Sequence, residues 1–406
     1  MKQVGKKLFV VFPALLLVAA SLLAACQAEA GLKPMTSPPA TAAASEKEQE
    51  VKERKEFKII ECSGTPYEIG KQYGTACRDS IRKSIQGLIG GMGFMQRVGK
   101  EEILAAAKKY LPLVERFDPD MIEMLKGQAE GAGVTFEEVF ALRCGTELNW
   151  YYQRIHTLCT SFAITGKATR GGQTIIGQTY DWGPGTPMDL VKTKYNNGLE
   201  QLSLVIGAGV GGEVLLNSAG LGMVLNVMYS PPEKQALNVP FAYVISKAMR
   251  QERIGDALGV VCASGRSILH YAFASAEGDI IGIETHPNGF NVLYPESDML
   301  VHTNHYLTER FKGSDGSFFT SMEGDSYIRL QRIKGLIETR YGELTPEIMM
   351  DILSDHTDYP RSICKHADMG VNLGETIAAI IIVPEDGVMY VAYGQPCKYE
   401  FVKYQL

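Results

Sequence analysis

Beyond residue 158 the chain is a succession of short strand-like segments, and this constrains the fold more than any other feature. The runs SFAIT, QTIIGQTYDW, LSLVIGAG, EVLLNSAG and GMVLNVMYS follow one another, with Gly and Asn turns between them. Helix pairs are expected at about 240–263 and 325–353, and strands between and after them. Antiparallel strands alternating with helix pairs favour an α+β fold in which two packed sheets are covered by helices. The 42 glycines fit such a sheet-rich fold, because tight turns need them.

The part before residue 158 has a different pattern of apolar residues. FKIIECSG reads as a short strand, and Thr65-Pro66 then opens a helix. Further helical patterns follow, including one that starts at a capping box from Thr135 to Glu138. We therefore expect residues 66–145 to be mostly helical. Gly70 and Gly74 weaken the first helix, which indicates close packing against a neighbouring element.

The N-terminus has the pattern of a secretion signal. Lys2, Lys6 and Lys7 precede an apolar stretch from Leu8 to Leu23. The stretch is short for a membrane span and contains Pro13, which argues against an uncleaved membrane helix. Its end, Leu-Ala-Ala-Cys, resembles the bacterial lipobox, and we predict a lipoprotein signal peptide over residues 1–25 with lipidation at Cys26.

Residues 26–56 are rich in Ala, Pro, Ser and Thr and end in the charged run SEKEQEVKERKE. Such a composition cannot bury enough apolar surface to fold, so a disordered tether is expected there. The folded unit would be 57–406, with a mostly helical part at 57–158 and a nucleophile-bearing part at 159–406. The protein would be extracytoplasmic and held at a bacterial membrane through its lipid anchor alone.

The charge and cysteine patterns argue against several other classes of protein. The formal net charge is -6, and no stripe of Lys and Arg interleaved with aromatic residues is present, which argues against a nucleic-acid partner. Seven cysteines follow Cys26, and an odd number leaves at least one thiol free if the others pair. No C-x-x-C spacing supports a zinc ribbon or a thioredoxin-type site. We therefore predict neither a metal nor a cofactor.

The stretch HTLCTSFAITGKATRGGQTIIGQTYDW, from His156 to Trp182, reads as two strands joined by a turn at Gly171-Gly172. The first strand begins at Cys159, and the second ends at Asp181. A hairpin would therefore bring this carboxylate close to the thiol.

Another polar cluster is HTNHY, at the end of a later strand. On a strand, His302 and Asn304 share one face while His305 faces the other way. The two histidines would not easily bind one metal ion, which weakens a zinc interpretation of H-x-x-H.

Six segments together resemble one known family. They are ECSGTPYEIGKQYG, CTSFA, QTYDW, NSAGLGMVLN, HTNHY and DHTDYPRSICKH, in the family's order from Glu61 almost to the C-terminus. The chain resembles the acyl-coenzyme A:6-aminopenicillanic acid acyltransferase family of N-terminal nucleophile hydrolases, which is related to choloylglycine hydrolases. The resemblance implies an αββα sandwich, with two mainly antiparallel sheets between helical layers. It also implies a proenzyme that cuts its own backbone between Leu158 and Cys159, although many relatives have glycine where this chain has Leu158.

The resemblance also implies roles for individual residues. Asp181 matches the aspartate that orients the amine of the nucleophile, and Asn304 matches the asparagine that donates to the oxyanion. The family's basic residue near the C-terminus falls at Arg361 or Lys365, and the motif does not choose between them. Asn226 is a further candidate for the site lining, or else a structural turn residue. Cys364 and His366, which flank the lysine, are either a thiol-imidazole pair or buried structural residues.

An N-terminal cysteine can supply its own general base. Its α-amino group, with an ordinary pKa of about 7.7–8.0, can serve as the general base for its thiol. The expected activity is hydrolysis of an amide or thioester, or transfer of its acyl group, through an acyl-Cys159 intermediate on a small-molecule substrate. Two alternatives stay open: an unprocessed cysteine hydrolase in which Cys159 pairs with His302, and a lipoprotein that binds acylated ligands without turnover.

Overall fold

The computed structural model describes residues 51–151, 158–228, 237–264, 267–314, 324–367 and 374–406. Residues Glu50–Leu406 form one compact unit. The predicted signal peptide and residues 26–50 of the predicted tether, including Cys26, lie outside the described residues. Among the described residues, no helix combines the length and apolar character needed to cross a membrane.

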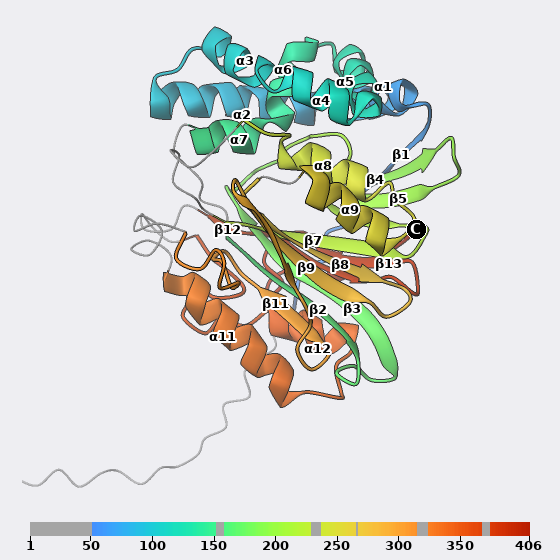
Figure 1. The fold of residues 1–406 in the computed structure, drawn as a ribbon, viewed down its shortest axis with the longest axis vertical. Coiled ribbons are helices and arrows are strands. Elements are labelled where there is room, and N and C mark those ends of the chain that lie inside the picture. The colour runs from blue at the N-terminus through green and yellow to red at the C-terminus, as the bar shows by residue number, and fades with distance from the viewer. Residues whose placement is uncertain (1–50, 152–157, 229–236, 265–266, 315–323, 368–373) are drawn as a thin grey trace, which may run out of the picture. The chain divides into compact units, whose positions relative to one another are not determined.

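A cap of helices precedes the sheets, as expected from the sequence (Figure 1). It contains α1 (Pro66–Ala76), α2 (Arg78–Gln96), α3 (Lys100–Lys108), α4 (Leu111–Phe117), α5 (Pro119–Ala132), α6 (Phe136–Arg143) and α7 (Gly145–Tyr151). Both predicted start signals are present, because Thr65 caps α1 and Thr135 caps α6, each with a complete capping box.

Glycines allow α1 and α5 to pack backbone to backbone. A Cβ atom built on Gly70 would lie 1.8 Å from the carbonyl oxygen of Met124, and one on Gly127 would lie 2.0 Å from that of Tyr67. Any larger side chain at these positions would force the two helices apart. The close packing predicted from Gly70 and Gly74 is therefore confirmed.

The described strands form two sheets. The first has the order β1 (Ile59–Gly64), β4 (Met188–Tyr195), β5 (Glu200–Ile206), β6 (Val214–Asn217), β7 (Leu221–Val227), β8 (Leu269–Ser275), β9 (Ile280–His286) and β10 (Gly289–Leu293). The second has the order β11 (Met299–His302), β2 (Leu158–Gly166), β3 (Gly172–Trp182), β12 (Glu375–Val383), β13 (Val388–Ala392) and β14 (Phe401–Gln405). Neighbouring strands are antiparallel except for β1 and β4, which are parallel.

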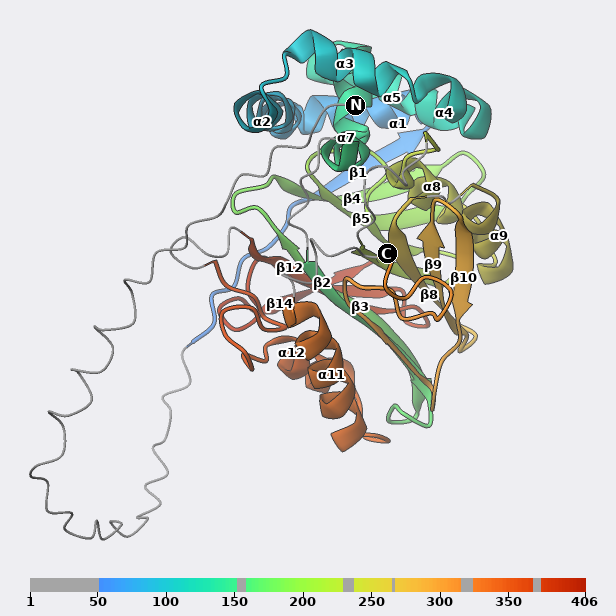
Figure 2. The ribbon, with the colours of Figure 1, turned by 60° about the vertical axis from the view of Figure 1, so that its left-hand side comes forward.

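The two sheets stack face to face, and helices cover their outer faces (Figures 1 and 2). A cluster including Leu202, Ile176 and Ile380 fills the space between the sheets. Helices α8 (Phe241–Ala248) and α9 (Ile254–Ser264) pack on the eight-stranded sheet. Helices α11 (Gly324–Thr339) and α12 (Pro346–Leu353) pack on the six-stranded sheet. The predicted α+β architecture, with two mainly antiparallel sheets between helical layers, is confirmed.

Alternation along β2 shows why this sequence suits a buried central strand. Ala163 belongs to the cluster between the sheets, whereas Phe162 and Ile164 belong to the cluster beneath α11 and α12. Side chains alternate between the two faces of a strand, so apolar residues are needed at consecutive positions when both faces are covered.

The predicted tether ends earlier than residue 56. The backbone of Glu53 exchanges hydrogen bonds with the chain near the C-terminus, donating to the carbonyl of Lys398 (2.8 Å) and accepting from the amide of Glu400 (2.9 Å). The ammonium of Lys55 lies 3.6 Å from the ring centre of Tyr393. Composition could not show this, because the contacts are made by backbone groups and by a residue far away in the sequence.

Candidate functional site

Cys159 lies at the start of a central strand of the six-stranded sheet, and its side chain is 1% exposed. The predicted hairpin is present: β2 pairs with β3, so that Cys159 faces Tyr180 and Leu158 faces Asp181. The cysteine and the aspartate therefore lie on neighbouring strands, one register position apart. The turn uses Gly171 and Gly172 at positive φ, 78° and 82°, as the glycine pair suggested.

Asn304 contacts the backbone of Cys159 directly. The backbone N–H of Cys159 donates to Asn304 Oδ1 (2.9 Å), and Arg329 Nη2 donates to the same oxygen (3.0 Å). The amide nitrogen of Asn304 donates to the carbonyl of Val227 (2.7 Å). The asparagine thus holds the backbone nitrogen of Cys159. Its role as an oxyanion donor stays a prediction.

Two further side chains hold the carbonyl oxygen of Cys159. Asn226 Nδ2 donates to it at 3.1 Å and Arg329 Nη1 at 2.9 Å. Asn226 belongs to β7, so this contact also ties the eight-stranded sheet to the start of β2. The structure thus brings the sequence candidate Asn226 into the site.

Sequence reasoning missed Arg329. It comes from α11, is 1% exposed, and also donates to Thr160 Oγ1 (2.9 Å). Its Nε lies 3.5 Å from the carboxylate of Asp325, one turn earlier on the helix. The sequence does contain one sign of this residue, because Asp325 and Arg329 form an i,i+4 pair of opposite charges. Such pairs are much more common on solvent-exposed helix faces, so the pair did not indicate a buried site.

Asp181 is buried at 1% exposure, and its Oδ1 accepts a hydrogen bond from Thr376 Oγ1 (2.7 Å). Its Oδ2 has no hydrogen-bond partner among the described residues. Burial raises the pKa of Asp181 to about 6, although the nearby charges of Lys365 and Arg329 act in the opposite direction. A buried carboxylate with one oxygen unused can bind a further donor, such as an amine formed at Cys159.

The structure distinguishes the two basic candidates near the C-terminus. Lys365 is 1% exposed, and its ammonium lies 3.4 Å from Asp325 Oδ2. Arg361 is only partly buried and makes no side-chain hydrogen bond or ion pair with the described residues of this site. Of the two candidates, Lys365 is therefore the one whose charge acts on Asp181. It offers a single point charge where arginine would offer a planar fork.

In the uncut chain the thiol of Cys159 is held in its neutral form. Burial, followed by the negative charge of Asp181, raises the pKa of this thiol to about 12. A thiol is a good nucleophile only as the thiolate, so this thiol would need a base to take its proton before it could act as one.

Both ring nitrogens of His302 contact residues other than Cys159. Its Nε2 lies 2.9 Å from Glu284 Oε1 and its Nδ1 lies 2.7 Å from the carbonyl of Thr303. With both ring nitrogens occupied, His302 is not placed as the base of Cys159. His305 contacts Ser326 Oγ (2.8 Å) and the hydroxyl of Thr303 (3.3 Å), whereas His302 contacts the carbonyl of Thr303.

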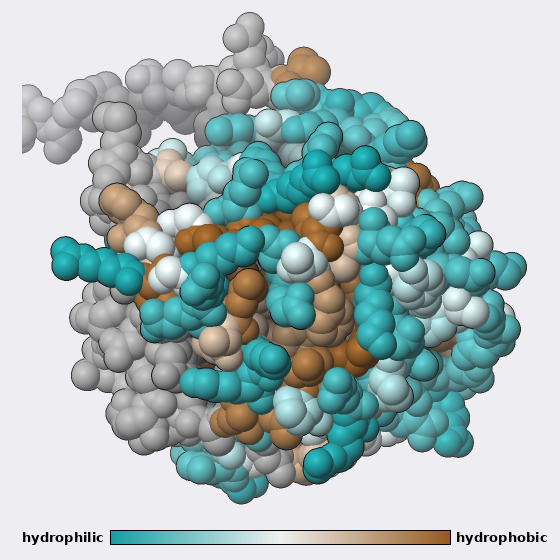
Figure 3. Space-filling view, turned by 90° about the horizontal axis from the view of Figure 1, so that it is seen from above, coloured by the Kyte–Doolittle hydropathy of each residue, from teal (hydrophilic) through white to brown (hydrophobic). Residues whose placement is uncertain are grey.

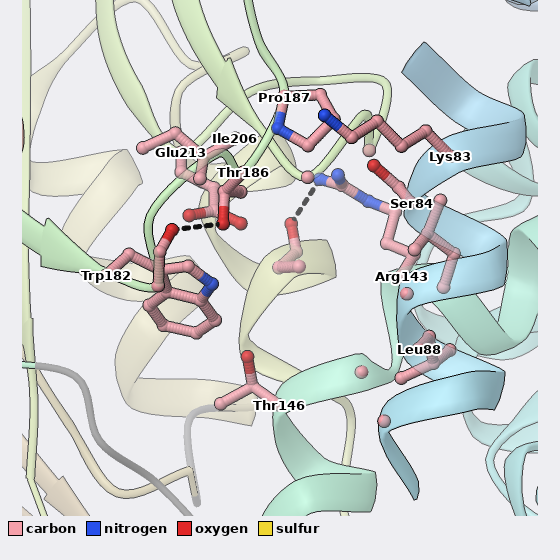
Figure 4. A pocket seen from close by; sticks show the side chains of 18 of the residues that line it. Lys83, Ser84, Leu88, Arg143, Thr146, Trp182, Thr186, Pro187, Ile206 and Glu213 are labelled. Atoms are coloured by element: carbon pink, nitrogen blue, oxygen red, sulfur yellow. Dashed lines mark hydrogen bonds between the residues drawn. The ribbon is translucent and has the colours of Figure 1, made fainter. Parts of the chain in front are cut away.

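A pocket of about 520 Å³ opens beside Tyr180. Tyr180, which pairs with Cys159 across the two strands, forms part of the pocket wall. Cys159 itself does not line the pocket. Figure 4 shows Lys83, Ser84 and Leu88 of α2 on one side of the cavity and Trp182 and Glu213 on the other. Apolar residues also contribute, namely Met92, Leu142, Pro187, Ile206 and Phe241. Seen from above, the molecule exposes apolar surface in a hollow bounded by hydrophilic residues (Figure 3).

Three charged side chains line this pocket, namely Lys83, Arg143 and Glu213. Arg143 is 5% exposed and donates to the carbonyl of Ala242 (2.7 Å). Glu213 accepts a hydrogen bond from the hydroxyl of Tyr180, and burial raises the pKa of its carboxyl. The cavity is thus mainly apolar with a few fixed polar groups, as is common in small-molecule sites.

A separate cluster forms around the loop that carries Lys365. The side chains of His356, Cys364, His366 and Cys397 offer ligand atoms that all lie within 4.8 Å of one another. The pair of Cys364 and His366 considered from the sequence is present, with Sγ and Nε2 3.6 Å apart. His356 and Cys397 were not foreseen as their neighbours, because Cys397 is contributed by a turn more than thirty residues away.

The chain is similar to several known proteins. A curated relative, the acyl-coenzyme A:6-aminopenicillanic-acid-acyltransferase 40 kDa form of Emericella nidulans, is 25% identical over 328 residues, covering 79% of this chain and 88% of the relative. A solved mutant of conjugated bile acid hydrolase from Clostridium perfringens has a TM-score of 0.40 and 13% identity, covering 61% of this chain and 97% of that one. The N-acylethanolamine-hydrolyzing acid amidase ortholog of Caenorhabditis elegans has a TM-score of 0.39 and 17% identity, covering 61% and 100%.

The family comparison covers more than half of the chain. The family described as acyl-coenzyme A:6-aminopenicillanic acid acyl-transferase matches residues 168–398. The match begins after Cys159 and includes Asp181, Asn226, Asn304 and Lys365. The chain belongs to the acyl-coenzyme A:6-aminopenicillanic acid acyl-transferase family.

Proposed function

We propose that this protein is an acyltransferase or amide hydrolase that uses Cys159 as its nucleophile after cutting its own backbone before that residue. Family membership supports an enzyme of this general kind. The observation that carries the finer proposal is the hydrogen bond from the backbone nitrogen of Cys159 to Asn304 Oδ1, at the start of a central strand and beside Asp181. Cleavage before Cys159 would turn this buried nitrogen into an amine that stays within reach of Asn304 Oδ1 and of the unused Oδ2 of Asp181.

Self-cleavage would proceed by an acyl shift. The thiol of Cys159 adds to the carbonyl carbon of Leu158 and loses its proton, the C–N bond breaks, and the released nitrogen takes up a proton as an amine. The resulting thioester between the Leu158 carbonyl and the Cys159 sulfur is then hydrolysed by water, which yields a carboxylate and regenerates the thiol. Asn226 and Arg329 hold the Cys159 carbonyl throughout and so fix the residue from its other side.

In the cut enzyme the new amine would take the thiol proton and later return it to the leaving group. Asn304 Oδ1 already contacts this nitrogen, and the unused Oδ2 of Asp181 is available to orient it. The thiolate attacks the substrate carbonyl and expels the amine or thiol. Water or a second amine then removes the acyl group from Cys159.

The pocket beside Tyr180 would receive the acyl group. Directly paired residues on antiparallel strands lie about 5 Å apart, so a carbonyl carbon could reach Cys159 from a pocket bounded by Tyr180. The apolar wall suits a hydrophobic acyl chain, while Arg143 and Glu213 suit a polar substituent. Acyl-coenzyme A, with and without 6-aminopenicillanic acid, and a panel of N-acyl amides are the substrates to test first.

Intact-mass analysis of the purified protein tests the proposal. Wild type should give two polypeptides, one of them beginning at Cys159, and should turn over at least one of these substrates. Cys159→Ala should remain one uncut, inactive chain. Cys262→Ser is the matched control, because this cysteine lies on α9 and should affect neither cleavage nor turnover.

Other outcomes would favour the alternatives. A wild type that stays in one chain and still hydrolyses substrate would refute self-processing and favour an uncut cysteine hydrolase. Binding of acylated ligands that survives Cys159→Ala, with no turnover in any preparation, would favour a binding protein.

We also propose that the mature chain is a lipoprotein attached at Cys26 and held outside the cytoplasm of a bacterium. The support is the sequence pattern of the first 26 residues. Expression in a bacterial host with a labelled fatty acid should label wild type and place it in the membrane fraction, whereas Cys26→Ser should be unlabelled. An unlabelled, freely released wild type would contradict this.

A further inference from the structure

Two cysteines and two histidines converge where the loop after α12 meets the turn between β13 and β14. His356, Cys364 and His366 belong to the loop, and Cys397 belongs to the turn. Cys364 is fully buried and Cys397 partly buried, whereas His356 is exposed, so the cluster reaches the surface on one side. Cys2His2 is among the usual ligand sets of structural zinc sites.

The distances fit a tetrahedral ion. Zinc bonds of about 2.3 Å to sulfur and 2.0–2.1 Å to nitrogen imply edges of roughly 3.8 Å between two sulfurs, 3.3 Å between two nitrogens and 3.6 Å for a mixed pair. The two Sγ atoms lie 3.5 Å apart and the two Nε2 atoms 3.1 Å apart. His366 Nε2 lies 3.6 Å from the Sγ of Cys364 and 3.4 Å from that of Cys397. The remaining pairs are within 4.8 Å.

We propose that His356, Cys364, His366 and Cys397 bind one structural Zn²⁺ ion. Binding requires neutral imidazoles and two thiolates, so the two thiols release two protons as the ion enters and no oxidation or reduction occurs. Four protein ligands complete a tetrahedral shell, which is typical of a structural rather than a catalytic zinc ion. The ion would cross-link two segments that are otherwise separated by β12 and β13.

The site is joined to the proposed catalytic centre through the backbone. Lys365 lies between two of the ligands, its N–H donates to Thr376 Oγ1 (2.9 Å), and its carbonyl accepts from the N–H of Thr376 (3.0 Å). The same hydroxyl of Thr376 donates to Asp181 Oδ1 (2.7 Å). The zinc ion would thus fix the loop that places the Lys365 ammonium near Asp325 and Asp181, which is a positioning role.

The metal content of the Cys159→Ala chain tests this independently of the proposed function, since that variant needs neither self-cleavage nor turnover to be assayed. Purified without a histidine tag, it should contain about one zinc per chain by elemental mass spectrometry. His356→Ala alters an exposed residue and should leave the fold intact, yet it should weaken zinc binding by more than the roughly 10–100-fold lost with an outer-shell partner. Cys397→Ser should do the same. Cys262→Ser, on α9, should keep its zinc.

Two further measurements distinguish a bound zinc ion from a disulfide and from four side chains that bind no metal. Replacement by Co²⁺ should give the visible absorption of a tetrahedral cobalt ion with thiolate ligands, and Cys397→Ser should change it. A chelator should lower the melting temperature of the parent and have little effect on His356→Ala. Absence of zinc after reconstitution under reducing conditions would overturn the proposal. So would a Cys364–Cys397 disulfide, detected as a mass two hydrogens lower, in protein purified without oxidant.

Discussion

Replacing Arg329 by methionine tests whether this buried guanidinium organises the site. Methionine has a similar length and no charge, so it removes the hydrogen bonds to the Cys159 carbonyl, Thr160 and Asn304 while filling most of the space. Each hydrogen bond to a charged group contributes about 1.5–3 kcal/mol, but burying the guanidinium offsets part of the sum. Removing one partner of a buried pair typically costs about 3–5 kcal/mol. We expect a loss of this size in the free energy of unfolding.

The measurement is urea unfolding in the Cys159→Ala background, where every sample is a single uncut chain. The matched control is Arg332→Met on the same helix, whose side chain is 39% exposed and pairs with Asp355 at 2.6 Å. A surface ion pair of this kind contributes about 0–1 kcal/mol. A loss below about 1 kcal/mol for Arg329→Met, or one equal to that of the control, would refute the assigned role.

Three other changes should have distinct outcomes. Burial raises the pKa of Asp181 to about 6 from an ordinary 3.8. The protonated carboxyl is therefore favoured by folding, and the stability that it contributes at low pH is lost as the pH rises through 6. In the Cys159→Ala background, the free energy of unfolding of Asp181→Asn minus that of its parent should therefore rise by about 3 kcal/mol from about pH 4 to pH 7. A difference that does not change with pH would contradict this. Gly127→Ala should lower stability by at least about 2 kcal/mol because its Cβ would meet a carbonyl of α1 at 2.0 Å, whereas Gly87→Ala, with open space around it, should be neutral or stabilising; equal melting temperatures would argue against the close packing. Lys365→Met should slow turnover at least about tenfold and Arg361→Met less than about twofold, and the reverse order would reassign the basic residue.

The pairing of Cys159 with the region of Asp181 could be predicted because it is local. A turn rich in glycine between two alternating strands specifies a hairpin. The register, which shifts between Ile164 and Gly166, came only from the structure. The layered architecture was equally accessible, since strands with apolar residues at consecutive positions must be covered on both faces. Asn226 and Asn304 could be nominated only through resemblance to the family, because nothing local indicates that they meet.

The contacts across the layers were decided by the tertiary structure. Arg329 reaches Cys159 because α11 packs on the six-stranded sheet, and the charge of Lys365 rather than that of Arg361 acts on Asp181 because of the path of one loop. Cys397 joins His356 and Cys364 because β12 and β13 return the chain to that loop.

The sequence by itself therefore determined the strands, the helical cap and the hairpin that bears Cys159, because these depend on periodicity and turn chemistry within a few residues. Only the tertiary structure decided which charged and metal-binding side chains meet around that hairpin. Such meetings depend on how separate elements pack, and a buried charge shows no periodic signal in the sequence to mark its partner.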